Sequence, residues 1–192
     1  SLRNKLMDRI AKDLKHIFLK ANSKLLNEDL ELFLCHVSER TLCGALKQHL
    51  DYYIAKTRFC GYHTDVEYNR NINGRIKTCC IEDEKDGLQT ITINCDLIVH
   101  SRGHIIEQDN LIAIEMEKSN RSKKEKDADK KRLKALTKNS FDDIWSFDGT
   151  SLAEHVCRYK LGVYYEINYR KHTILLKYHY HGNKQYADTI AL

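Results

Sequence analysis

The sequence contains no proline. Turns must therefore be built by glycine, asparagine and aspartate, and no proline-rich linker divides the chain. Long apolar runs are also missing, because no stretch approaches the roughly 20 apolar residues of a membrane-spanning helix. The charged beginning at residues 1–5 lacks the apolar core of a signal peptide. We therefore expect a protein without a membrane partner.

Cysteine is present but lacks paired spacing. The chain has 7 cysteines, an odd number, and none of them form a Cys-x-x-Cys pair. This argues against a complete disulfide framework and against a zinc ribbon. The adjacent Cys79 and Cys80 come nearest to a redox pair, although buried free thiols are the simpler interpretation. The pattern predicts a cytoplasmic protein, where thiols stay reduced.

The chain has enough apolar material for a core. It has 192 residues, of which 42% are hydrophobic, and it is expected to fold as one domain over residues 1–192. Within it we expect a helical extension at 1–37, a core at 38–163 and a C-terminal hairpin at 164–192. The formal net charge of +5 is modest, so the distribution of charge matters more than the sum.

Three segments have helical spacing. Apolar residues recur every three or four positions over residues 2–20, which predicts an amphipathic helix. A second helix is expected to begin after Ser38, a good N-cap, and to reach Ile54. The motif Ser122-x-x-Glu125 is a capping box, which opens a third helix that ends near Thr137.

Alternation of apolar and polar residues predicts strands at 62–68, 90–99 and 111–118, and a hairpin at 160–167 and 173–180. A turn is expected at 71–74, irregular structure at 75–89 and a loop at 138–151. The order is helix, strand, strand, strand, helix, strand, with an extra N-terminal helix and a C-terminal hairpin. It predicts an α/β protein.

The stretch from 90 to 120 delivers carboxylates to one place. Asp96 lies on the polar face of the first strand, and Glu115 and Glu117 share a face of the second, opposite Met116. Neighbouring carboxylates repel unless a cation or proton lies between them, and Mg²⁺ takes oxygen ligands of this kind. From the residues alone, polar side chains that face water at strand ends are the favoured explanation.

The same stretch resembles the PD-(D/E)XK nuclease superfamily, which has the restriction-endonuclease-like fold. Residues 96–103, Asp-Leu-Ile-Val-His-Ser-Arg-Gly, and 111–120, Leu-Ile-Ala-Ile-Glu-Met-Glu-Lys-Ser-Asn, look like an uncharacterised bacterial branch. The likeness covers about 38–163. It implies an α-β-β-β-α-β core with a mixed sheet flanked by helices, and hydrolysis of DNA phosphodiesters. It also implies Mg²⁺ or Mn²⁺ held by Asp96, Glu115, Glu117 and the Met116 carbonyl.

Two residues depart from that superfamily's pattern. Cys95 stands in place of proline, which is a tolerated change. Glu117 stands in place of the motif lysine, and a carboxylate cannot neutralise charge. Three interpretations stay open: a two-metal site, a replacement cation such as Lys130 or Lys134, or a disabled enzyme. Lys118 is sent to the opposite face unless a bulge intervenes.

Two further acids are candidates for the site. The resemblance implies that Glu67 flanks the metal and that Arg70 meets phosphate, because the branch has a similar Glu-Tyr-Asn-Arg. A solvated strand residue explains Glu67 about equally well. Glu39 matches a helix acid of some of these nucleases, although stabilisation of the helix N-terminus is the favoured explanation.

Segment 118–134 has nine basic residues against three acidic ones, a local charge of +6. A basic helix beside a metal site can hold a phosphodiester backbone without reading sequence, whereas a solvated helix face is the plain alternative. The residues expected to contact nucleic acid, DNA in the first place, are Arg70, Lys118, Lys123, Lys130, Lys131 and Lys134. An inactive module of the same fold that binds nucleic acid or protein stays open, as do a structural role and a homodimer.

Overall fold

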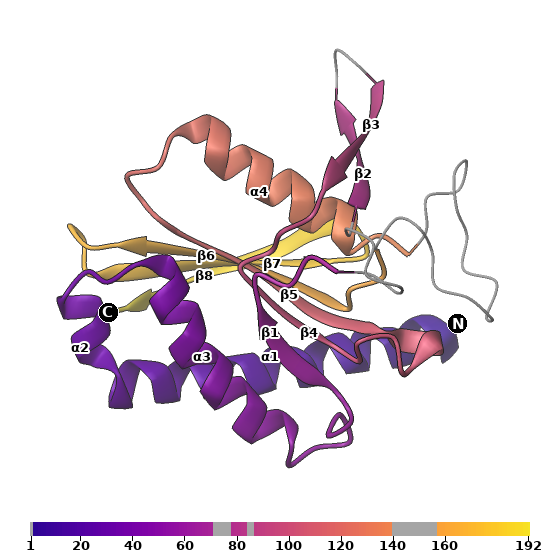
Figure 1. Ribbon diagram of the computed structural model, residues 1–192, viewed down its shortest axis with the longest axis horizontal. Coiled ribbons are helices and arrows are strands. Elements are labelled where there is room, and N and C mark those ends of the chain that lie inside the picture. Colours follow the sequence, from indigo (N-terminus) through magenta and orange to yellow (C-terminus); the bar gives the residue numbers. More distant parts are fainter. Residues whose placement is uncertain (1, 71–77, 84–86, 140–156) are drawn as a thin grey trace.

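A computed structural model describes residues 2–70, 78–83, 87–139 and 157–192 (Figure 1). The protein is α/β, with a six-stranded mixed sheet that has helices on both faces and a separate two-stranded sheet. Within the described ranges, no helix combines the length and the hydropathy needed to cross a membrane. The turn expected at 71–74 and most of the loop expected at 138–151 lie outside these ranges.

Three helices precede the sheet: α1 (Leu2–Glu28), α2 (Leu30–Leu34) and α3 (Glu39–Ile54). Helix α3 begins as predicted, because the Ser38 side chain accepts a hydrogen bond from the Thr41 backbone N–H. The predicted end of α1 near residue 20 was wrong. Asn22 does not break the helix, because its side chain is buried and accepts a hydrogen bond of 2.8 Å from the Tyr165 hydroxyl.

The large sheet has the order β1-β4-β5-β6-β7-β8. Its strands are β1 (His63–Val66), β4 (Leu97–His100), β5 (Asn110–Lys118), β6 (Leu161–Asn168), β7 (Thr173–Tyr180) and β8 (Asn183–Ala191). Neighbours are antiparallel except β5 and β6, which are parallel and joined through α4 (Lys123–Leu136). The α4 capping box and the β6–β7 hairpin are confirmed. Strand β8 extends the expected hairpin and was not predicted, because its edge position leaves its sequence largely polar.

The single strand predicted at 90–99 was wrong. Strands β2 (Thr78–Asp83) and β3 (Gly87–Thr92) form the two-stranded sheet where irregular structure was expected, and β4 begins only at Leu97. A single 3-10 turn, Ile106–Gln108, separates β4 from β5. The alternation misled because Ile93 and Cys95 are buried although residues 93–96 have no regular secondary structure.

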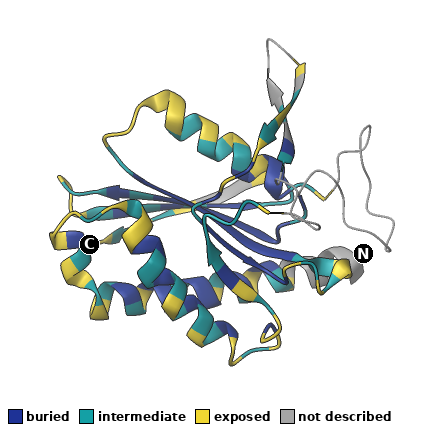
Figure 2. Ribbon diagram, in the orientation of Figure 1, coloured by how far each residue is buried: buried dark blue, intermediate teal, exposed yellow. Residues whose placement is uncertain are grey.

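The two faces of β5 point into different layers. Ile112, Ile114 and Met116 pack with the helices α1 and α3, whereas Ala113 belongs to the smaller cluster beneath α4. Helices α1 and α3 lie on one side of the sheet and α4 on the other (Figure 1). Figure 2 shows the strands between these layers as the most deeply buried part. Polar residues of β5 that share the Ala113 face are therefore buried under α4.

Candidate functional site

The ends of β1, β4 and β5 bring three acidic residues together. The predicted pairing of β4 with β5 is confirmed, and it places Leu97 opposite Ile114. Asp96 accepts a hydrogen bond of 2.7 Å from the Met116 backbone N–H through its side chain, and its own carbonyl accepts one of 3.1 Å from Glu67 N–H. Glu67, Asp96 and Glu115 therefore lie at adjacent positions of the sheet.

Burial disfavours the charged form of the carboxyl groups of Asp96 and Glu115. Burial raises the pKa of Asp96 to about 6, against the Met116 N–H that lowers it. Burial also raises the pKa of Glu115, and the charges of Asp96 and Asp129 push it further in the same direction. Glu115 is only 2% exposed. Acids of this kind favour a nearby cation, and shifted pKa values of this sort gather at functional sites.

Arg132 is the cation that contacts Glu115. Its Nη1 lies 2.6 Å from Oε1 of Glu115 and 3.0 Å from Oδ1 of Asp129. The sequence analysis did not single out Arg132 or Asp129. Their spacing could have identified them, because positions 129, 132, 133 and 136 share one face of α4. Leu133 and Leu136 on that face are buried. Polar residues on an apolar helix stripe point toward the sheet.

Glu117 has a different set of neighbours. The Tyr164 hydroxyl contacts both Glu117 Oε1 and, at 2.6 Å, Glu166 Oε2, and its one proton serves one carboxylate at a time. Lys126 Nζ lies 3.3 Å from the same Glu166 oxygen. Burial raises the pKa of Glu117, although the Tyr164 hydrogen bond opposes the shift. Glu117 thus faces α4 as expected, but it is held by tyrosine.

The two lysines expected to replace the motif lysine do not contact these acids in the structure. Lys130 Nζ lies 3.4 Å from Asp127 and 4.9 Å from the centre of the Tyr164 ring, and Lys134 is exposed. Instead, Arg132 pairs with Glu115, and Lys126 pairs with Glu166, which shares the Tyr164 hydroxyl with Glu117.

Two acids form the rim on the α3 side. Glu67 lies 3.6 Å from the exposed Arg40, and Glu39 lies 3.7 Å from Arg121. The Glu39 charge contributes to the raised pKa of Asp96, so this helix acid acts on the site in addition to its place in the first turn of α3. Burial raises the pKa of the Cys43 thiol, and the charges of four surrounding acids add to it: Asp96, Glu115, Glu39 and Glu67.

The expected nucleic-acid contacts are divided between two faces. Lys123, Lys131 and Lys134 are exposed on α4, and Lys130 is half-buried. Lys118 lies on the opposite face from Glu117, as predicted, and donates a hydrogen bond of 3.2 Å to the His36 carbonyl, away from α4. Arg70 is exposed where the first described segment ends.

The chemistry of the donors fits a divalent cation, because the carboxylates of Asp96, Glu115 and Glu117 are hard oxygen ligands of the type that Mg²⁺ and Mn²⁺ prefer. Their present arrangement is not a ready ligand set. Among the described residues, no three His, Cys, Asp or Glu side chains are placed to hold one ion. Glu115 points to Arg132, and Asp96 is bonded to Met116 N–H.

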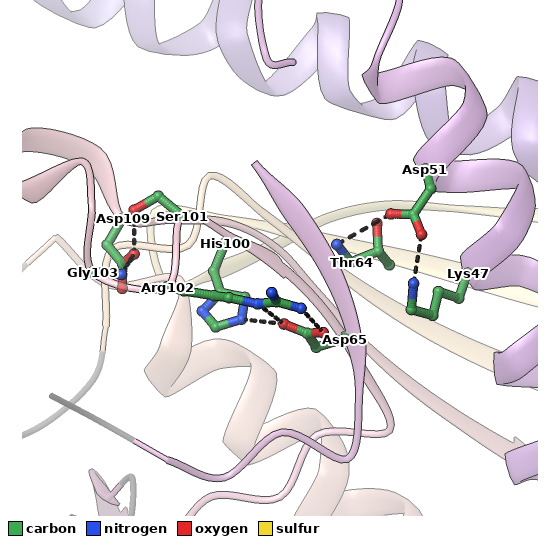
Figure 3. Close-up of polar contacts among 9 residues, drawn as sticks. All are labelled: Lys47, Asp51, Thr64, Asp65, His100, Ser101, Arg102, Gly103 and Asp109. Carbon is green, nitrogen blue, oxygen red and sulfur yellow. Dashed lines mark hydrogen bonds and ion pairs between the residues drawn. The ribbon is translucent and has the colours of Figure 1, made fainter. Parts of the chain in front are cut away.

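A second polar cluster joins Asp65 of β1 to His100, the last residue of β4, and to the loop that follows it (Figure 3). Asp65 contacts His100 Nε2 at 2.9 Å and accepts from Arg102 Nε at 2.8 Å and Nη2 at 2.6 Å. Nearby, Asp109 accepts from the Ser101 hydroxyl at 2.5 Å and from the Gly103 N–H at 2.8 Å. At about 3.3 Å per strand residue, four residues separate His100 from Asp96 by about 13 Å along β4, whereas Asp65 pairs with Ile98, two residues from Asp96. These residues of the distinctive 96–103 phrase hold strands and a loop together.

No protein-family model, curated protein or solved structure matches the chain. Function is therefore inferred from the geometry and chemistry of the site. That site combines Asp96 and the buried acid Glu115, an arginine that contacts Glu115, and a basic helix alongside.

Proposed function

We propose that the protein is a nuclease that hydrolyses DNA phosphodiester bonds and depends on Mg²⁺ or Mn²⁺. The observation that carries this proposal is the placement of Asp96, which directly precedes β4, beside Glu115 of the neighbouring strand β5, each with a raised pKa. The order α3-β1-β4-β5-α4-β6 supports it, because this is the α-β-β-β-α-β order of the restriction-endonuclease-like core with β2 and β3 inserted.

The residues that would hold the cation are Asp96, Glu115 and the Met116 carbonyl, with Glu117 joining them if it leaves Tyr164. Such a cation supplies polarisation of the scissile phosphate and a lowered pKa for a bound water. The chain's own part is to place the ligands. The Met116 N–H fixes the Asp96 carboxylate, and burial of Glu115 under α4 keeps water from competing for it.

Helix α4 supplies the surface for the DNA backbone. Lys123, Lys130 and Lys134 are separated by seven and four positions, so they follow one stripe of the helix. Lys131 adds a further exposed charge beside that stripe. Lysines arranged in this way bind phosphates without reading bases, which predicts weak sequence preference and strong salt dependence.

The second candidate is an inactive module of the same architecture that binds nucleic acid or a protein. The Arg132–Glu115 ion pair favours it, because an internal cation already neutralises the acid. The two candidates share the basic surface of α4 and differ in cleavage.

Cleavage of plasmid and single-stranded DNA by highly purified protein tests the proposal. We expect cleavage with Mg²⁺ or Mn²⁺, none with a chelator, and binding more than cutting with Ca²⁺, whose looser coordination orients water poorly. Asp96→Asn and Glu115→Gln should each abolish cleavage, and the double variant should lose no more, since either change dismantles one site. Glu31→Gln, on the exposed surface of α2, is the matched control and should cut normally.

Two outcomes decide against the nuclease. Cleavage by Asp96→Asn at the wild-type rate places the activity elsewhere or in a contaminant. DNA binding without cleavage under any divalent cation, with circular dichroism showing a folded protein, favours the inactive module.

A further inference from the structure

Arg132 makes an unusual contact for an arginine on a basic helix. Its side chain is 22% exposed, whereas most of the α4 lysines lie on the surface, and it reaches inward to Glu115, whose side chain is 3% exposed. The same Nη1 also contacts Asp129, 3.0 Å away. Buried Leu133 and Leu136 pack that stretch of α4 against the sheet, so the guanidinium stays close to the acids.

The guanidinium is not saturated by these contacts. Both of its hydrogen bonds to acids come from Nη1, and the buried Nε has no hydrogen-bond partner among the described residues. Arginine carries five N–H donors in a rigid fork, which suits two oxygens of one phosphate. The side chain therefore has donors to spare beside a site proposed to act on phosphodiesters.

The formal charges around Arg132 set up a competition. Three acids are involved: Asp96, Glu115 and Asp129. Among the described contacts, Arg132 is the one cation that pairs with Glu115 and Asp129. A divalent cation that takes Glu115 as a ligand must replace the guanidinium there. Removal of the arginine charge should therefore make the acids bind a divalent cation more tightly.

We propose that Arg132 is a built-in counter-cation that holds Glu115 until a divalent cation binds, and is then released to bind a phosphate oxygen of the nucleic acid. This inference rests on the proposed function, because it takes Glu115 as a cation ligand. In this role Arg132 is a positioning residue that couples cation binding to the grip on the substrate.

Isothermal titration calorimetry of the full chain with Mn²⁺ at mildly alkaline pH tests the first half of the proposal, that Arg132 holds Glu115 until a divalent cation binds. Arg132→Gln should bind Mn²⁺ about tenfold more tightly than the wild type, and Arg132→Lys, which keeps the charge but lacks the fork, should lie between them. Arg58→Gln is the matched control, because it removes an arginine from an exposed ion pair with Asp13 of α1 and should leave Mn²⁺ affinity unchanged.

Each outcome of that titration decides. Equal or weaker Mn²⁺ binding by Arg132→Gln overturns the inference, because the arginine then only orders Glu115. Binding that appears in Arg132→Gln and is undetectable in the wild type supports it. Absence of binding in both overturns it together with the metal-dependent nuclease. Thermal unfolding of each metal-free variant identifies any that does not fold, and Arg132→Lys then carries the test.

The second half is measured by cleavage and by DNA affinity at saturating Mn²⁺. Arg132→Gln should cleave at least about tenfold more slowly while holding Mn²⁺ more tightly, a split that a purely structural role would not produce. Unchanged cleavage overturns the phosphate contact. If the wild type does not cleave, the nuclease proposal fails, whereas tighter Mn²⁺ binding by Arg132→Gln still upholds the counter-cation.

Discussion

Asp65 and Glu115 are both acids that contact an arginine, yet their surroundings act on them in opposite directions. Burial raises the pKa of Asp65, but hydrogen bonds from Arg102 and His100 outweigh it and bring the pKa to about 2. Glu115 has one Arg132 nitrogen, Nη1, as its hydrogen-bond donor, and this nitrogen also donates to Asp129, so burial dominates and the pKa of Glu115 rises. The first acid is a structural anchor, and the second remains open to a better cation.

The Asp65 anchor predicts a loss of stability in acid. Its pKa is about 2 in the folded protein against an ordinary 3.8, so its contribution is present above pH 3.8 and disappears as the pH falls toward about 2. Asp65→Asn should lower the free energy of unfolding near neutral pH by roughly 2 kcal/mol and flatten its decline in acid. Urea unfolding across this pH range measures both effects.

Asp13→Asn is the comparison for that experiment, because the Asp13–Arg58 ion pair is exposed. Exposed pairs contribute about 0–1 kcal/mol, so little change is expected. A loss in Asp13→Asn as large as that in Asp65→Asn would mean that the buried cluster has no special role.

Helix α4 has two functions that lie on different sides of the element. Its inward stripe carries Asp129, Arg132 and Leu133 toward the sheet, and its outward stripe carries the lysines. Both belong to one rigid element with a complete capping box at Ser122 and Glu125. A change in how α4 sits on the sheet should therefore affect the acids and the basic surface proposed to bind DNA together.

The outward stripe predicts salt-dependent DNA binding. Lys130→Glu with Lys131→Glu should weaken binding and lower the slope of log affinity against log salt by about 1 for each phosphate that is no longer neutralised. Lys12→Glu with Lys20→Glu, on exposed positions of α1 across the sheet, makes the same change in net charge and should have little effect. Binding that does not respond to salt in the wild type would contradict the basic-helix interpretation.

The space around two glycines predicts opposite effects of an added methyl group on stability. A Cβ at Gly162 of β6 would lie 3.0 Å from Thr137 Cγ2 and 3.2 Å from His179 Cβ, so Gly162→Ala should destabilise the protein by about 1–3 kcal/mol. A Cβ at Gly44 within α3 meets nothing within 4 Å, so Gly44→Ala should stabilise it by about 0.5–1 kcal/mol. Thermal unfolding measures both, and equal effects would contradict this packing.

At the scale of the whole molecule, the site is where three layers meet. The sheet contributes Glu115 of β5, and Asp96 directly precedes β4. Helix α3 on one side of the sheet contributes Glu39, and α4 on the other side contributes Arg132 (Figure 1). Folding therefore brings acids from separate elements together, with Arg132 pairing with Glu115 and Asp129. The energetic cost of that gathering depends on pH and on divalent cations.

The gathered acids predict a pH-dependent stabilisation by Mn²⁺. The folded pKa of Asp96 is raised from 3.8 to about 6, so the metal-free protein should lose stability as the pH rises through this window. Above this pH window, Mn²⁺ at 100 times its dissociation constant should raise the free energy of unfolding by about 2.7 kcal/mol. Below the window, protons should displace Mn²⁺ from the carboxylates. Differential scanning calorimetry with and without Mn²⁺ measures this, and Glu31→Gln should behave like the wild type.

Asp96→Asn should reduce the pH dependence in that window, because the raised pKa of Glu115 still contributes to it, and should remove the Mn²⁺ effect. Equal stabilisation of Asp96→Asn and wild type by Mn²⁺ would mean that the ion binds elsewhere.

Local interactions let the sequence by itself determine the main elements. The Ser38 cap, the Ser122–Glu125 capping box and the alternation along β5 each act within a few residues, so they are visible in the order of residues. The same alternation predicted that Glu115 and Glu117 share one face of the strand. Alternation could not show that β3 and β4 are separate strands, because Ile93 and Cys95 are buried outside any strand.

Only the tertiary structure decided what each acid contacts. The continuation of α1 past Asn22 depends on Tyr165, which is 143 positions away. The contact of Arg132 with Glu115, rather than Lys130 or Lys134, depends on how Leu133 and Leu136 seat α4 on the sheet. Such contacts join distant parts of the chain, and their energies depend on burial that exists only once the layers have packed.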